Sequence, residues 1–219
     1  SNPMNFALLF GWLLSLWILG WAVLPYSRRI FARLPDEGLA AGRVLFVVLA
    51  TLLCFWLASL RLISLEWAPA IFLTLAISAR WVSLKPQNRA RFLENWRVKL
   101  VSDAVFLGAF GVLIWLRSGN PSAQHFESPM DMALLSGAMR ADFLPFTNPW
   151  WSDAPFTNYY YFGHLCAALL AKTLLAAPHL AYNLALAAFG AFFLSTLWSA
   201  GAALTKSAWR SRRPPGRAA

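Results

Sequence analysis

Long apolar runs alternate with short polar connections along the whole chain. The pattern predicts helices at residues 4–24, 39–60, 67–84, 100–116, 160–177 and 181–204. Each run is about 17 to 25 residues long, the length that a helix needs to cross a hydrocarbon core about 30 Å thick. Because a helix satisfies its own backbone hydrogen bonds in lipid, these runs predict an all-α polytopic membrane protein with about six transmembrane helices.

The composition supports a membrane location. The 219 residues are 59% hydrophobic and 13% charged, whereas a soluble domain is roughly a quarter charged. The net charge of +10 comes mainly from residues at the ends of apolar runs, where they set orientation and meet anionic head groups. We therefore expect membrane lipids as partners and no nucleic acid. Cys54 and Cys166 fall inside predicted spans, which indicates buried free thiols.

The distribution of Lys and Arg predicts an orientation. The connections after the first and third runs hold nine basic residues, counting Arg80, and should be cytoplasmic. The N-terminus and the connection at 117–159 are then outside. The basic tail at 205–219, predicted to be disordered, conflicts with six complete spans because they place it outside too. Either one of the last two runs fails to cross, or the chain is truncated, and we favour truncation.

Most of the polar chemistry gathers between residues 125 and 164, where four of the nine acidic residues and two of the three histidines lie. Ser128 and Pro129 suit the cap and first turn of a helix that ends near Arg140. This helix is amphipathic and too short to span, so it should lie in the interface or pack on the bundle. Asp131 either completes a capping box or forms an acidic pair with Glu127 that acts as general base or holds a cation.

Aromatic residues follow this predicted helix. Trp150 is typical of an interfacial belt, and it equally suits stacking on a sugar. The run Tyr159-Tyr160-Tyr161 points in three directions around a helix, so at least one tyrosine should face the bundle. His164 lies one turn after Tyr160, and a histidine inside a membrane helix is either a site residue or a satisfied helix–helix contact.

Two further ionisable residues lie inside predicted spans. Asp103 is four residues after Lys99, and pairing with that lysine explains it adequately. Lys172 is predicted to snorkel toward the cytoplasmic boundary. Neither residue indicates a site.

Two motifs carry a resemblance to a known family. The motifs are E-x-P-M-D at 127–131 and N-Y-Y-Y-F-G-H at 158–164, and L-P-D-E-G-L-A-A-G-R at 34–43 supports them. Together they resemble the prokaryotic integral membrane family named for its YYY motif. That family is uncharacterised and is grouped with GT-C-type glycosyltransferases, which transfer sugar from a polyprenyl-phosphate carrier.

The resemblance implies a function and a set of site residues. It implies a GT-C-like membrane glycosyltransferase in the prokaryotic cytoplasmic membrane, with an extracytoplasmic loop at 117–159 and a lipid-linked sugar donor. Glu127 and Asp131 would be the catalytic carboxylates, or the ligands of a divalent cation such as Mg²⁺ or Mn²⁺. The residues expected to contact the substrate are Ser128, Trp150, Tyr159, Tyr160, Tyr161 and His164.

The sequence departs from the family pattern in two ways, and one other function also fits the same residues. Family members usually run to several hundred residues, so this chain resembles the N-terminal part of one. Many relatives carry Asp-Pro-Trp where this chain has Asn148-Pro149-Trp150, which removes one acid. A transporter or lipid-binding membrane subunit without catalysis would use the same histidine and aromatic entrance to bind its substrate.

Overall fold

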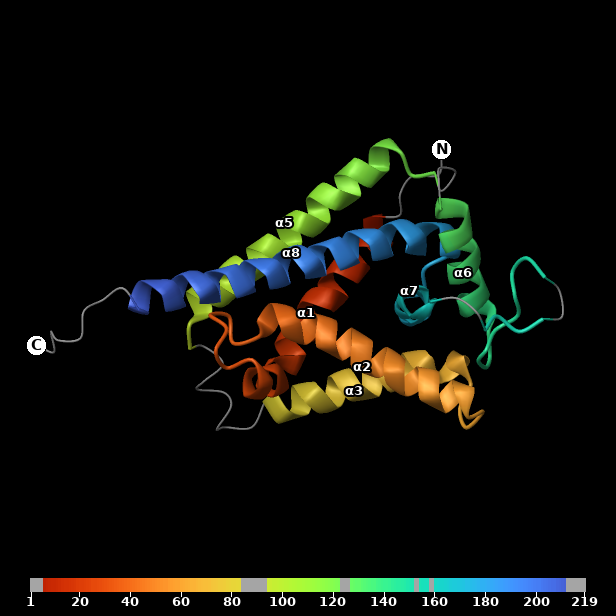
Figure 1. Ribbon diagram of the computed structural model, residues 1–219, viewed down its shortest axis with the longest axis horizontal. Helices are drawn as coiled ribbons and strands as arrows, with labels where there is room; N and C mark the ends of the chain where they lie inside the picture. The colour runs from red at the N-terminus through yellow and green to blue at the C-terminus, as the bar shows by residue number, and fades with distance from the viewer. Residues whose placement is uncertain (1–5, 84–93, 123–126, 152–153, 158–159, 212–219) are drawn as a thin grey trace, which may run out of the picture.

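The computed structural model describes residues 6–83, 94–122, 127–151, 154–157 and 160–211 (Figure 1). Its helices are α1 Phe6–Ile30, α2 Leu39–Ser59, the short 3₁₀ helix η1 Leu65–Trp67, α3 Ala68–Ser83, α5 Trp96–Gly119, α6 Ser128–Arg140, α7 Phe162–Thr173 and α8 Pro178–Ser211. Five of the described helices are long and apolar enough to cross a membrane. The predicted polytopic helical fold is therefore confirmed.

The predicted span at 160–177 does not form as expected. α7 ends at Thr173 after 12 residues, so it is about 18 Å long at 1.5 Å per residue, and it is not among the candidate spans. The chain turns at Leu175, whose φ of 55° is left-handed, and α8 begins at Pro178. In Figure 1, α7 is seen nearly end-on while the five long helices run across the view.

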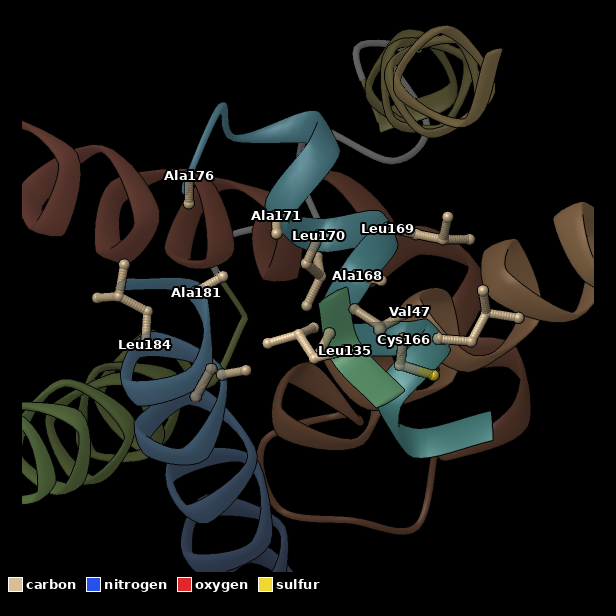
Figure 2. Packing of buried hydrophobic residues seen from close by; sticks show 14 of the residues in the cluster. Val47, Leu135, Cys166, Ala168, Leu169, Leu170, Ala171, Ala176, Ala181 and Leu184 are labelled. Atoms are coloured by element: carbon tan, nitrogen blue, oxygen red, sulfur yellow. The ribbon is translucent and has the colours of Figure 1, made fainter. Parts of the chain in front are cut away.

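Protein contacts, rather than lipid, account for the apolar sequence of α7. Its residues from Leu165 to Ala171 are all buried. Figure 2 shows five of them, Cys166, Ala168, Leu169, Leu170 and Ala171, in the same buried cluster as Val47 of α2, Leu135 of α6 and Leu184 of α8. A helix that is hydrophobic on all sides belongs either in lipid or inside a protein, and the tertiary structure places this one inside.

Other boundaries differ from the predicted ones. α1 continues through Pro25 to Ile30, because neighbouring helices can satisfy the backbone groups that a proline frees in a membrane helix. α5 is longer at both ends than the predicted 100–116. α8 reaches Ser211, so the first part of the predicted disordered tail at 205–219 is helical. Residues 212–219 lie outside the described part.

The long helices collect their connections at two ends (Figure 1). The connection from α1 to α2, the start of α5 and the end of α8 lie together at one end, which we name the basic end after Arg28, Arg29, Arg33 and Lys99. The turn from α2 to α3, with α6 and α7, lies at the other, which we name the site end. Backbone bonds close the site end: Leu65 N–H donates to Asp142 O at 2.7 Å and Leu144 N–H to Ala58 O at 3.5 Å.

Buried carboxylates tie the helices together at the basic end. Asp36 is fully buried and accepts four hydrogen bonds, two from the backbone of Gly38 and Ala40 at the start of α2. The others come from Ser102 of α5 at 2.9 Å and Ser199 of α8 at 2.6 Å. Because a buried charge is tolerated only when its lone pairs are satisfied, Asp36 fixes these three helices relative to one another.

The expected pairing of Asp103 with Lys99 is wrong. Asp103 instead forms an ion pair with the fully buried Arg43 of α2, and it accepts the indole N–H groups of Trp17 and Trp21 at 2.9 and 2.7 Å. Lys99 pairs with Glu37 at 3.0 Å. Asp36 and Glu37 thus hold α5 in place. The four-residue spacing of Lys99 and Asp103 on α5 does not identify the partner of either residue.

Candidate functional site

α6 begins one residue earlier than a capping box built on Ser128 requires. Ser128 is the first helical residue, Glu127 is the N-cap, and no side chain caps the helix. The expected capping role of Ser128 and Asp131 is therefore wrong. The Asp131 carboxylate points elsewhere, toward α7.

Asp131 and His164 form the central contact of the site. The Asp131 Oδ1 atom lies 3.0 Å from His164 Nε2, and both side chains are partly buried, with exposed fractions of 30% and 20%. The Tyr182 hydroxyl, on the second turn of α8, donates to Asp131 Oδ2 at 3.5 Å. Three short stretches of chain, on α6, α7 and α8, thus converge on one carboxylate.

These three side chains line a small cavity. Its volume is about 250 Å³, and Tyr160 completes the polar rim, while Leu135 and Phe189 are among the apolar residues that form the wall. A cavity with an apolar wall and a few convergent polar groups is the usual form of a ligand site. The cavity is at the site end of the bundle.

A basic side chain stands behind Tyr182. Arg117, in the last turn of α5, donates from Nε to Asn183 Oδ1 at 2.8 Å, and its guanidinium carbon lies 5.9 Å from the centre of the Tyr182 ring. Its Nη2 atom is buried and has no hydrogen-bond partner. A buried donor without an acceptor is costly, and Arg117 does not line the cavity, so its guanidinium contributes positive charge to the site from behind Tyr182.

The three tyrosines have different surroundings. Tyr160 is 77% exposed and lines the cavity, although it precedes the first turn of α7. Tyr161 packs against Phe146 and Phe156, with ring centres 5.0 and 5.9 Å apart, and burial raises the pKa of its hydroxyl. Tyr159 lies outside the described residues. Tyr161 therefore packs against the aromatic residues of the loop between α6 and α7. Tyr160 faces the cavity.

The remaining predicted site residues do not line the cavity. Glu127 is exposed, and Ser128 is partly buried at the helix start. Trp150 is 58% exposed and tilts against Phe156 at 6.2 Å. The structure brings together Asp131, Tyr160 and His164 from the predicted set.

A metal centre built on Glu127 and Asp131 does not fit this arrangement. Among the described residues, no three His, Cys, Asp or Glu side chains gather closely enough to hold a metal ion. Asp131 contacts His164, and Glu127 does not line the same cavity. Glu127 and Asp131 do not form a joint cation site in this arrangement.

Lys172 lies at the site end, beside the end of α6, and not at the opposite end of the bundle that a full span at 160–177 would give it. Its Nζ donates to Ala141 O, just after α6, at 3.2 Å. Burial lowers the pKa of this amine, and the nearby carboxylates of Glu66 and Asp142 partly oppose that effect. Lys172 thus fastens the end of α7 to the loop that follows α6.

Sequence reasoning missed Tyr182, Asn183 and Arg117. The signal for the first two was a Tyr-Asn pair one turn after the Pro178-His179 break in an otherwise apolar run. Arg117 gave no signal in the sequence beyond a charge at the end of the apolar run 100–116. Their common position emerges because α5 and α8 lie side by side (Figure 1).

Five apolar spans in the described part of the chain, with a cavity of apolar wall and polar rim at one end of the bundle, define a polytopic helical membrane protein. The chain belongs to the family DUF2298, described as an uncharacterized membrane protein, whose model matches residues 49–217. That match begins in the middle of α2 and covers every residue of the site. Comparison with curated proteins and with solved structures found no match. Cys54 and Cys166 are buried free thiols, as predicted.

Proposed function

We propose that this chain is a membrane glycosyltransferase, or the N-terminal part of one, that takes sugar from a polyprenyl-phosphate carrier. The observation that carries the proposal is the Asp131–His164 contact at the rim of a cavity. A carboxylate held by an imidazole is positioned to accept a proton. Family likeness supplies the reaction class, and the site supplies the residues.

In this reaction Asp131 is the general base. It accepts the proton of the acceptor hydroxyl while the acceptor oxygen bonds to the anomeric carbon of the sugar. The bond from that carbon to the phosphate oxygen breaks, and its electron pair leaves with the polyprenyl phosphate. His164 orients the carboxylate through the 3.0 Å contact.

Tyr160 and Arg117 stabilise the leaving phosphate in this proposal. The Tyr160 side chain lines the cavity, and the Arg117 guanidinium lies behind Tyr182, 5.9 Å from the centre of its ring. Arg117 does not line the cavity, so it acts through its positive charge and not by direct contact. Negative charge grows on the phosphate during transfer, so both groups act mainly on the transition state.

The site end faces outside in this proposal, in a prokaryotic cytoplasmic membrane. With five spans, an N-terminus outside puts the basic end and the end of α8 in the cytoplasm, as the positive-inside rule requires. The conflict over the basic tail then disappears because α7 does not cross. A run that does not cross accounts for the position of the basic tail without any assumption about the length of the chain.

Turnover of polyprenyl-phosphate sugars by the natural full-length protein in proteoliposomes tests the proposal. We expect Asp131→Asn to lower the rate about 100-fold or more, the usual range for loss of a general base, while donor binding persists. Asp142→Asn, an exposed acid at the same end, is the matched control and should retain activity. Unchanged turnover in Asp131→Asn contradicts the catalytic role and favours a transporter or lipid-binding subunit.

A separate variant distinguishes the two carboxylates. Glu127→Gln should affect turnover much less than Asp131→Asn, because Glu127 is exposed and does not line the cavity. The reverse order of effects would move the base to Glu127. The measurement is the same donor-turnover assay on both variants.

A further inference from the structure

A second apolar site lies away from the cavity, along the groove between α2 and α3. One hollow of about 520 Å³ is lined by α1, α2 and α3 near the basic end. Another of about 560 Å³ is lined by α2, α3 and the turn between them, near the site end. Leu53 and Leu75 line both hollows, so the two form one groove that follows the bundle from end to end.

The groove is open to the outer surface of the helical bundle. Leu49, Leu53 and Leu75 on its rim are exposed large hydrophobic residues, and Ser78 is also exposed. Gly42 forms part of the wall at the basic end, where an added Cβ would lie 2.7 Å from Ser27 Cβ. The close packing of α1 on α2 at Gly42 leaves room for a ligand on the α3 side.

The two mouths of the groove differ in charge. Tyr26 lines the mouth at the basic end, and the Arg29 guanidinium lies 6.0 Å from the centre of its ring. The nearest acids along the chain, Asp36 and Glu37, are buried and engaged by other groups. The positive charge of Arg29 is therefore available at the surface, whereas the mouth at the site end is flanked by charges of both signs, the exposed Arg61 and Glu66.

We propose that this groove binds an anionic phospholipid. The phosphate lies at the basic mouth against Arg29 and the Tyr26 hydroxyl, and one acyl chain follows the groove past Leu53 and Leu75. Each hollow by itself falls in the volume range of ordinary ligand sites. The basic mouth selects the anionic head group, because each Lys or Arg near a membrane surface attracts anionic lipid. This site is independent of the proposed glycosyl transfer.

Thermal stabilisation of the purified protein by defined lipids in mild detergent tests this inference. Dioleoyl phosphatidylglycerol should raise the melting temperature at concentrations where dioleoyl phosphatidylcholine, with the same chains, raises it little. Arg29→Gln should weaken the apparent affinity for phosphatidylglycerol about fivefold. Arg80→Gln removes an equal charge from exposed surface on α3 outside the groove and should leave the affinity unchanged.

A second variant tests the groove itself. Ser78→Trp fills the hollow from its exposed rim and should abolish the stabilisation, because the indole occupies the path of the acyl chain. Ile77→Trp, at a neighbouring exposed position that does not line the groove, should preserve it. Equal effects of the two head groups, or equal losses in Ser78→Trp and Ile77→Trp, would overturn the proposal. Stronger stabilisation by polyprenyl phosphate than by phosphatidylglycerol, lost in Ser78→Trp, would also overturn it.

Discussion

The role that local sequence predicts for Asp131 differs from the role that the tertiary structure gives it. Its spacing from Ser128 suits a capping box, yet the helix starts at Ser128 and the carboxylate contacts His164, 33 residues away. The carboxylate therefore contacts the imidazole of another helix and does not cap its own helix. The sequence could identify Asp131 as special without identifying its partner.

At the residue scale, Gly20 provides a test of the buried ion pair. An added Cβ at Gly20 would lie 2.8 Å from Arg43 Cζ, and Arg43 is fully buried between α1 and α5. We expect Gly20→Ala to lower stability by about 1–3 kcal/mol, the usual cost of overpacking. The measurement is the unfolding midpoint in detergent.

Gly11, on the same helix, is the matched control for that substitution. An added Cβ there meets nothing within 4 Å, and alanine favours helix over glycine by up to about 1 kcal/mol. Gly11→Ala should therefore be neutral or stabilising. If both substitutions have the same effect, the packing of Arg43 against α1 is not as close as described.

At the element scale, the pairing of α2 with α5 depends on Arg43 and Asp103. Their charges lie inside two spans, where an ionisable residue needs a partner. Asp103 also accepts from Trp17 and Trp21, so the same carboxylate holds α1. One residue thus fixes three helices.

Removing only the Asp103 carboxylate should lower stability more than removing both charges of the Arg43–Asp103 pair. Asp103→Leu leaves Arg43 buried without its counter-ion and should cost about 3–5 kcal/mol, whereas replacing a whole buried pair with apolar residues is often nearly neutral. The double variant Arg43→Met/Asp103→Leu should therefore recover most of the loss. Denaturation of the single and double variants in detergent measures this. Equal instability of the two would show that the indole contacts, and not the charge, dominate.

α7 shows why an apolar run by itself cannot be assigned to the membrane. The run at 160–177 has the length and composition of a span, yet its helix ends at Thr173 and is buried by α2, α6 and α8. Sequence hydropathy reports that a segment avoids water. Whether lipid or protein replaces the water depends on where the neighbouring helices lie.

At the scale of the whole molecule, the five-span arrangement makes a topological prediction. Leu175, which is 89% exposed, follows α7 and should be outside with Asn120, the residue after α5. Arg33, exposed at the basic end, should be inside. In a background with Cys54 and Cys166 replaced by alanine, Leu175→Cys and Asn120→Cys should react with a membrane-impermeant maleimide in intact cells. Arg33→Cys should react only after permeabilisation.

Asn120→Cys is the reference position, because five-span and six-span topologies both place it outside. If Leu175→Cys is protected while Asn120→Cys reacts, α7 crosses the membrane and the tail lies outside. If Arg33→Cys reacts in intact cells, the orientation is inverted. The basic mouth of the groove then faces the outer leaflet.

The sequence by itself determined the helical membrane class, most helix positions and the stretch that holds Asp131, Tyr160 and His164. Those features depend on run length, spacing and capping, which are local properties. Only the tertiary structure decided that α7 stays within the bundle, that Asp131 meets His164, and that Asp103 meets Arg43 across 60 residues. The partner of a charged side chain in a low-dielectric interior is set by which helices pack together, and a single sequence does not encode that in any local pattern.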